Sequence, residues 1–208
     1  MKLAYLHPTW FTPQIEKIKN IEQPYFLIRL SGLSAHHDFG IKGISIQILQ
    51  KTIDLLSPYG RVYISSENSL PDDFKSYNLS IPKSDIHHYL YYSKMLICDS
   101  QSMAVEAAML GTPSIRFSDF AGKISVLEEL EHTYQLTYGI STSNPVKLFE
   151  KIEELINIPN LRETFQARRQ QMLTDKIDVT AFMVWFIENY PQSVQTMKQN
   201  PEYQNKFR

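Results

Sequence analysis

Short apolar runs alternate with helix-patterned stretches along most of the chain. Between the runs, apolar residues recur at helical spacing, for example in 44–56 and 144–157. The runs are "YFLIRL" (25–30), "RVYISS" (61–66), "MLICD" (95–99), "PSIRF" (113–117) and "YQLTYGI" (134–140). Continuous apolar runs are typical of strands buried on both faces. The alternation therefore predicts an α/β fold, with a doubly wound, mainly parallel, Rossmann-like sheet covered by helices on both faces.

The pattern divides the chain into three parts. Residues 1–24 form a linker-like N-terminal segment, 25–190 one Rossmann-like domain, and 191–208 a polar tail that we expect to be frayed. Inside the domain, "LSI" at 79–81 is a candidate for a further short strand. Beyond residue 161 the pattern is helical only, and "AFMVWFIENY" near the end of the domain is unusually apolar.

Charge and composition exclude several classes of protein. The 21 basic and 22 acidic residues give a formal charge of −1, so no overall field attracts nucleic acid or an anionic membrane. No apolar run reaches the ~18 residues of a membrane span. Cys98 is the only cysteine, which excludes a disulfide framework, and its apolar surroundings favour an inert core thiol. We expect a soluble, cytoplasmic protein.

Polar residues follow the apolar run that ends at Cys98. Asp99, Ser100, Gln101 and Ser102 come next, and Glu106 lies about one turn inside the helix that they open. Ligands of parallel sheets bind at the carboxyl ends of the strands, where free backbone N–H groups at a helix start suit an anion such as a diphosphate. A carboxylate one turn further on can accept hydrogen bonds from two sugar hydroxyls.

Two interpretations of this segment remain open from the spacing alone. The serines can cap the helix while Glu106 complements its dipole, which is worth about 0.5–1 kcal/mol. Alternatively, the segment binds a ligand. Small residues in the helix body and the immediate "LGTP" return allow a close approach to the sheet, which favours ligand binding; these small residues are Ala104, Ala107 and Ala108.

Two arginines lie near strand ends. Arg29 and Arg116 are expected to face the same crevice as "DSQS", where two guanidinium groups would form an anion clamp. Alternatively, each arginine pairs with an acid such as Asp38 or Asp99. Glu67, directly after the second strand, is either a ligand contact or a solvated loop acid.

Two histidine pairs raise the question of a metal site. Adjacent helical residues point about 100° apart, so His87 and His88 cannot both face one ion, and neither pair has a known ligand spacing. We predict no metal. In "AHHDFG", His36 or His37 can act as a proton carrier or phosphate contact, and His37 is the catalytic candidate. One of His87 and His88 is expected at the solvent or the helix cap, and the other in the crevice or core.

The segment "DSQSMAVEAAMLGTPSIRF" resembles the donor site of two-domain GT-B glycosyltransferases and of the related UDP-N-acetylglucosamine 2-epimerases. Several blocks in order resemble the GT-B-like family called domain of unknown function 354: "AHHDFG", "GRVYISSE", "IHHYLYYSKMLICDSQSMAVEAAMLGTPSIRF" and "IDVTAFMVWFIENYP". The resemblance spans most of residues 1–190. It implies the fold of a GT-B C-terminal domain, since only the second half of such proteins is matched.

The resemblance also implies roles for individual residues. Ser100 and Ser102, with the backbone of "DSQS", would meet the diphosphate of a nucleotide-sugar, and Glu106 the sugar or ribose hydroxyls. The loop "IPKSDI" (81–86) would hold the base through its backbone. Arg29 and Arg116 would steady the phosphates. Asp99 and Gln101 complete the expected substrate-binding set.

These implications lead to a prediction of function. The chain is expected to be the donor-binding half of a GT-B-like glycosyltransferase in glycan or polysaccharide synthesis, with a nucleotide-sugar such as a UDP-sugar as substrate and no cofactor. Members of these families are usually much longer, with a first domain for the acceptor. A separate N-terminal domain or a homo-oligomer is the expected partner, and the apolar helix at 178–190 would pack on that missing domain. The alternatives are a UDP-sugar 2-epimerase-like enzyme and a non-catalytic nucleotide-binding or scaffolding module.

Overall fold

The computed structural model describes residues 4–32 and 43–208. A five-stranded sheet in the order β2-β1-β3-β4-β5 forms its centre, and all neighbouring strands are parallel. The strands are β1 (Tyr25–Leu30), β2 (Arg61–Ser66), β3 (Leu96–Cys98), β4 (Ser114–Phe117) and β5 (Tyr138–Ile140). The predicted parallel α/β sheet is confirmed.

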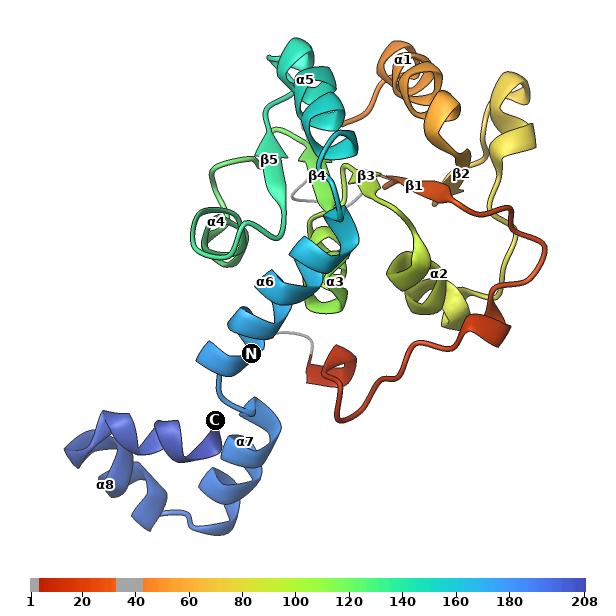
Figure 1. Cartoon of the computed structure of the whole chain (residues 1–208). Helices are drawn as coiled ribbons and strands as arrows, with labels where there is room; N and C mark the ends of the chain where they lie inside the picture. The colour runs from red at the N-terminus through yellow and green to blue at the C-terminus, as the bar shows by residue number, and fades with distance from the viewer. Residues whose placement is uncertain (1–3, 33–42) are drawn as a thin grey trace.

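Helices cover both faces of the sheet (Figure 1). One face carries α1 (Ile46–Leu56) and α5 (Pro145–Ile156). The other carries α2 (Ile86–Tyr92), α3 (Gln101–Leu110) and α4 (Ser125–His132). Helix α6 (Leu161–Asp175) packs on α3 and leads away from the sheet to α7 (Val179–Glu188) and α8 (Gln192–Gln199). The helices on two faces make the sheet doubly wound, as expected from the alternation of elements.

The helix starts follow from side chains that accept hydrogen bonds from the first free N–H groups. The Ser45 side chain accepts from the Ile48 N–H, and the Asn144 side chain accepts from the Lys147 N–H. Helix α3 ends at Gly111, whose φ of 67° is the left-handed conformation that glycine adopts most readily.

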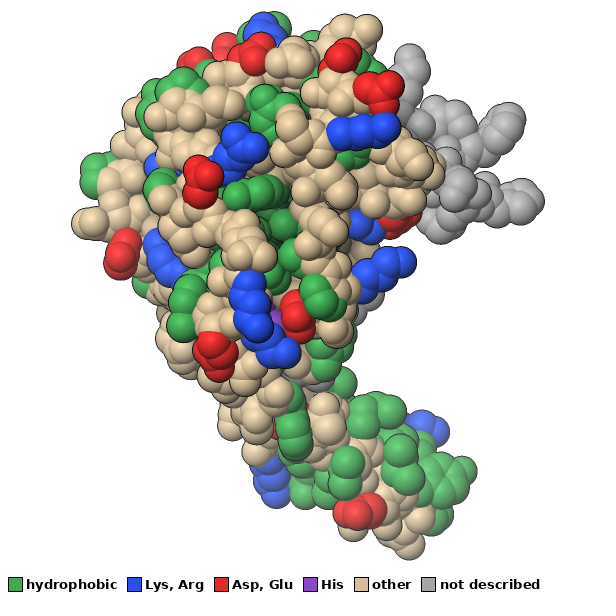
Figure 2. All heavy atoms as spheres, turned by 90° about the vertical axis from the view of Figure 1, so that its right-hand side faces the viewer, with side chains coloured by type: hydrophobic (Ala, Val, Ile, Leu, Met, Phe, Trp, Pro, Cys, Tyr) green, Lys and Arg blue, Asp and Glu red, His purple; other side chains and the backbone are tan. Residues whose placement is uncertain are grey.

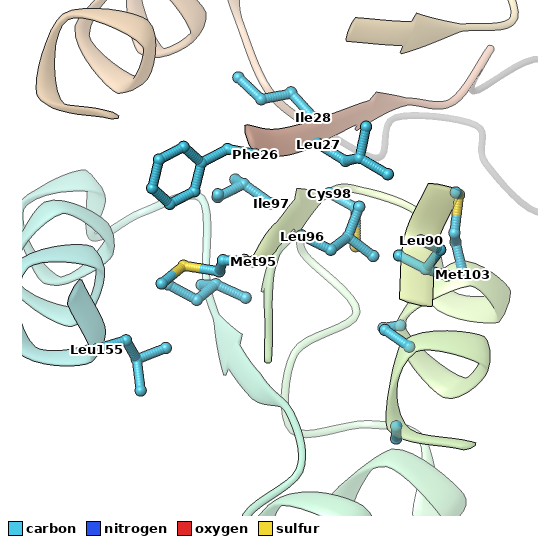
Figure 3. Close-up of a cluster of buried hydrophobic side chains, with 14 of the residues drawn as sticks. Phe26, Leu27, Ile28, Leu90, Met95, Leu96, Ile97, Cys98, Met103 and Leu155 are labelled. Carbon is cyan, nitrogen blue, oxygen red and sulfur yellow. The ribbon is translucent and has the colours of Figure 1, made fainter. Parts of the chain in front are cut away.

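The hydrophobic core lies on both sides of β1 and β3 (Figure 3). Side chains alternate along each strand, so Phe26 and Ile97 lie toward Leu155 of α5. Leu27, Leu96 and Cys98 face the opposite side, toward Leu90 and Met103 from α2 and α3. Each of these side chains is at most 6% exposed. This burial on both faces explains why the strands appear as continuous apolar runs in the sequence.

Two expected strands differ in the structure. The segment 79–81 forms no strand; next to it, Asn78 forms an isolated bridge with Ile64, and the Leu79 N–H donates to the Ile64 carbonyl at 2.8 Å. Pro82 follows directly and cannot donate a ladder hydrogen bond, which limits any strand at this point. The last strand covers 138–140 rather than 134–140, because Gln135 has a φ of 53° and turns the chain.

The N-terminal segment packs along α2. Leu6 is fully buried, and the Gln14 and Lys19 N–H groups donate to His88 and Tyr89 of α2. Two single-turn 3-10 helices interrupt it, Ala4–Leu6 and Ile15–Lys17. The described part of this linker-like segment is therefore held against the domain.

The C-terminal residues fold into a separate lobe with α7 (Figure 1). The expectation of a frayed tail is wrong, because α8 and a 3-10 helix, η7 (Pro201–Phe207), form there. Trp185 of α7 stacks on Tyr203, with ring centroids 4.7 Å apart, and lies 5.5 Å from Phe207. The aromatic residues of the tail thus cover part of α7 without burying any of its residues completely.

Helix α7 has no buried residue, despite its apolar sequence. Met183, Val184, Ile187 and Tyr190 are each between 48% and 68% exposed. Figure 2 shows hydrophobic side chains gathered on this lobe. Within the described residues, no helix has both the length and the apolar character needed to cross a membrane.

Candidate functional site

A pocket of about 640 Å³ opens at the carboxyl ends of β1, β2 and β3, on the face of the sheet that carries α2 and α3. Its walls come from the strand ends, the start of α3, the start of α2 and the loop between β2 and α2. The lining residues are Arg29, Ser65, Ser66, Glu67, Asn78, Leu79, Ile81, Lys83, Ile86, His87, Ser100, Ser102, Met103 and Glu106. This is the position at which parallel sheets bind their ligands.

The start of α3 forms one wall of the pocket. Ser100 is the N-cap, and its Oγ accepts a hydrogen bond from the Met103 N–H at 3.4 Å. The capping interpretation is therefore confirmed for Ser100. Ser102 is exposed, and its Oγ lies 3.4 Å from the Ser100 Oγ. The Ser102 hydroxyl and the positive end of the helix dipole are thus available to an anion in the pocket.

Glu106 lies at the junction of three segments. Its Oε2 is 3.2 Å from His87 Nε2, and the Tyr5 hydroxyl donates to its Oε1 at 3.5 Å. Only 18% of the Glu106 side chain is exposed. Burial, together with the Glu106 charge, raises the pKa of Tyr5, so that its hydroxyl stays a donor. A carboxylate offers about four acceptor positions, which leaves Glu106 able to accept from two ligand hydroxyls.

His87 is the pocket residue that the sequence left undecided. It faces Glu106, and its ring packs edge-on against Tyr5 and Phe11. His88 points the other way, where its Nδ1 accepts from the Gln14 N–H and burial lowers its pKa. One histidine of the pair thus faces the crevice, as expected, but neither lies at the solvent. Apart from tyrosines, the two histidines are the only polar residues between Asp85 and Ser93. This was the available signal that one of them faces the pocket.

Arg29 reaches the pocket and pairs with an acid there. Its Nη2 donates to Glu67 Oε1 at 2.5 Å and its Nη1 to Ser65 Oγ at 2.9 Å. Among the described residues, the acid that pairs with Arg29 is thus Glu67, not Asp99. Lys83, which the sequence reading did not single out, lines the same pocket and has no ionic partner in the described part of the chain.

Arg116 lies apart from this pocket. In the strand register, Arg29 and Arg116 flank Cys98 on the same side of the sheet. Helices α3 and α4 cover Arg116, which is fully buried and whose Nη1 donates to Gln101 Oε1 at 3.1 Å. The pocket therefore contains one of the two arginines of the expected clamp.

Asp99 and Gln101 do not line this pocket. Asp99 is 4% exposed, and its Oδ1 accepts from both the N–H and the hydroxyl of Ser31 at 2.7 Å. Burial raises the pKa of Asp99, and these hydrogen bonds oppose that effect. Asp99 lines a second pocket, of about 690 Å³, at the start of α1. Of the expected binding residues, the structure brings together Arg29, Ser100, Ser102 and Glu106.

The remaining candidates are His36, His37 and Asp38, which lie outside the described residues. Cys98 is fully buried, and this burial raises the pKa of its thiol to about 12, so it has no nucleophilic character. Among residues 4–32 and 43–208, no three His, Cys, Asp or Glu side chains lie together in a way that would hold a metal ion.

Comparisons with known proteins give a likeness of fold. No protein-family model and no curated protein matches the chain. Among solved structures, the chain is similar to CalG4, the calicheamicin glycosyltransferase, with a TM-score of 0.51, 16% identity, and coverage of 81% of this chain and 43% of that one. For the spinosyn rhamnosyltransferase SpnG, complexed with spinosyn aglycone, the TM-score is 0.46 and the identity 12%. The match covers 86% of this chain and 49% of that one.

A third similar structure is the wall teichoic acid polymerase TagF, with a TM-score of 0.42, 13% identity, and coverage of 73% of this chain and 39% of that one. The chain spans less than half the length of each of these proteins. At such identities the likeness concerns the fold alone. This chain has an α/β Rossmann-like fold that matches a domain of GT-B glycosyltransferases.

Proposed function

We propose that this chain binds the nucleotide-sugar donor of a GT-B-like glycosyltransferase, as the C-terminal half of such an enzyme, in glycan or polysaccharide synthesis. The observation that carries the proposal is the composition of one pocket: the start of α3, Glu106, Arg29 and the loop 78–83 line it together. Its volume of about 640 Å³ suits a nucleotide-sized ligand. We also propose that the chain is related to the family called domain of unknown function 354.

Each part of a nucleotide-sugar has a counterpart in this pocket. The diphosphate would lie at the α3 start beside Ser102, with Arg29 and Lys83 supplying positive charge. Glu106 would accept hydrogen bonds from sugar or ribose hydroxyls. The base would pack on the aliphatic residues Leu79 and Ile81. Stabilising the charge that develops on a leaving nucleoside diphosphate requires the same donors, so binding and catalysis would share them.

The exposed surface of α7 supports a partner for this half. Four large hydrophobic side chains of the α7 region are about half exposed or more. Contiguous apolar surfaces of this kind mark interaction sites. We propose that a separate N-terminal domain covers this surface and contributes the acceptor site.

Calorimetric titration of the 208-residue chain with UDP, GDP and their sugar conjugates tests the proposal. We expect binding that weakens about tenfold in Glu106→Gln, because a lost hydrogen bond to a charged group is worth about 1.5–3 kcal/mol. Ser102→Ala and Lys83→Met should weaken binding as well. Glu150→Gln and Lys147→Met, on the exposed face of α5, are the matched controls and should bind as the natural chain does.

Different outcomes separate the alternatives. Equal affinities of the pocket variants and the natural chain, or no binding of any nucleotide, would contradict the proposal and favour a scaffolding module. Incubation with UDP-N-acetylglucosamine, followed by NMR, distinguishes two reactions: a new sugar epimer would indicate an epimerase, whereas free UDP would indicate transfer or hydrolysis.

A further inference from the structure

We infer that Arg116 is a positioning residue, which holds the start of α3 in place through Gln101 without touching the ligand. The Arg116 side chain is fully buried in β4 beneath α3 and α4. Its Nη1 donates to Gln101 Oε1 at 3.1 Å. Gln101 is the first residue of α3, directly between Ser100 and Ser102. The contact therefore links the middle of the sheet to the helix start that borders the pocket.

The Gln101 side chain connects three segments through its amide group. While Oε1 accepts from Arg116, Nε2 donates to the Asp99 carbonyl oxygen at 3.2 Å and to Ser118 Oγ at 3.0 Å. The turn between β3 and α3 is thus fixed to the end of β4. Such a network restricts the positions that each of its side chains can take, and it therefore holds the turn in one conformation.

The charge arrangement around Arg116 is poor for stability. Among the residues that the structure describes, the Arg116 Nε and Nη2 have no hydrogen-bond partner, and Glu128 Oε1, 3.9 Å from Nη2, has none either. Glu131 accepts from the Gly139 N–H at 2.8 Å, and burial raises the pKa of that carboxyl. A buried ion cluster with unsatisfied atoms is often no more stable than an apolar one. A role in geometry explains why a guanidinium occupies this position.

Packing holds the guanidinium in one place. A Cβ atom added at Gly139, the β5 neighbour of Arg116 in register, would lie 2.4 Å from Arg116 Nη2.

On the other side of the turn between β3 and α3, the Asp99 carboxylate accepts hydrogen bonds from Ser31 at the end of β1. The turn that leads into α3 is thus held from β4 through Gln101 and from β1 through Asp99.

The inference rests on the proposed function in one respect, namely that a ligand's diphosphate binds at this helix start. It is tested with Gln101→Leu, Arg116→Met and Arg116→Lys. The matched control is Ser114→Ala, which removes a buried hydrogen bond, Ser114 to Thr137 at 2.9 Å, near the opposite end of the same strand. Gln101→Leu keeps the test decisive if Arg116→Met does not fold.

The first measurement is amide hydrogen exchange at Met103 and Ala104, whose N–H groups bond to Ser100. We expect exchange about tenfold faster in Gln101→Leu and Arg116→Met, equivalent to about 1.4 kcal/mol of local opening, with Arg116→Lys closer to the natural chain and Ser114→Ala unchanged. The second measurement is affinity for UDP-sugar, which should fall about tenfold in the same two variants, without a matching fall in Ser114→Ala.

The outcomes separate this inference from the proposed function. Unchanged exchange at Met103 and Ala104 in both variants would overturn it. Weaker affinity with unchanged exchange would also overturn it, because Gln101 would then contact the ligand directly. If the natural chain binds no nucleotide but exchange is faster in Gln101→Leu and Arg116→Met, the positioning role is supported and the proposed function is refuted.

Discussion

At the scale of single residues, the helices that cover a strand end decide whether a side chain there reaches the pocket or is buried. Arg29 and Arg116 both neighbour Cys98 in the strand register. Arg29 stands at an open strand end and reaches the pocket, whereas α3 and α4 cover Arg116. The same residue type is therefore a candidate ligand contact in β1 and a buried support in β4.

Gly111 offers a prediction at this scale. Its φ is 67°, and a Cβ there would lie 2.6 Å from Gln166 Nε2, which donates to the Leu110 carbonyl at the end of α3. Gly122 also has a positive φ, 79°, but a Cβ there would meet nothing within 4 Å. We expect Gly122→Ala to lower the free energy of unfolding by about 1 kcal/mol from backbone strain alone.

Gly111→Ala should lower the free energy of unfolding by about 2–3 kcal/mol. The backbone is strained as in Gly122→Ala, and in addition the new Cβ displaces Gln166 from its hydrogen bond to Leu110. Urea unfolding of both variants measures the difference. Equal losses would show that Gln166 adjusts freely and that its hydrogen bonds at the end of α3 contribute little.

At the scale of elements, local signals fix where helices begin. Asn144 followed by Pro145 predicts the start of α5, and the structure has that start, with the cap hydrogen bond to the Lys147 N–H at 3.3 Å. Strand lengths depend less on local signals. The expected strand at 134–140 shortens because a left-handed residue, Gln135, interrupts an otherwise favourable apolar pattern.

The Asn144 cap gives a prediction for the element. Asn144→Ala should lower the free energy of unfolding by about 1 kcal/mol and the Tm by about 2–4 °C, because the Lys147 N–H loses its acceptor. Asn144→Asp retains a side-chain oxygen and should stay close to the natural chain. Thermal unfolding followed by circular dichroism measures both, and a loss in the aspartate variant equal to that in alanine would argue against the cap.

At the scale of the whole molecule, the chain consists of an α/β body and a C-terminal helical lobe joined by α6 (Figure 1). The body contains the core and the candidate site. The lobe is held by an aromatic cluster, in which Trp185 lies between Phe182, Tyr203 and Phe207. The two parts should therefore respond differently to mutation.

Trp185→Ala tests this division. Loss of the stacking on Tyr203 should free the tail and raise the rate of trypsin cleavage after Lys198 about tenfold, since about 1.4 kcal/mol of local stability corresponds to that factor. Cleavage in the α/β body should not change. Trp10→Ala is the matched control, because Trp10 is 63% exposed. Accelerated cleavage throughout the chain in Trp185→Ala would show that lobe and body unfold together.

Patterns in the sequence predict the alternation of strands and helices and the parallel sheet, which the structure confirms, and they also indicate where a ligand site is expected. These follow from local periodicity, and from the rule that loops at the carboxyl ends of parallel strands converge. This rule selects four candidates that share one pocket in the structure, because each lies near a strand end: Arg29, Ser100, Ser102 and Glu106.

Which of the candidates share a pocket depends on the tertiary structure. Burial of Arg116 and Asp99 depends on helices and loops that pack over them from distant parts of the chain, and Gln101 contacts Ser118 across the end of β4. His87 faces Glu106 because of the rotation of α2 against α3, which adjacent histidines in a sequence do not specify. The ordered tail likewise depends on contacts between α7 and residues near 203–207, and long-range packing of this kind leaves no periodic signal in a polar segment.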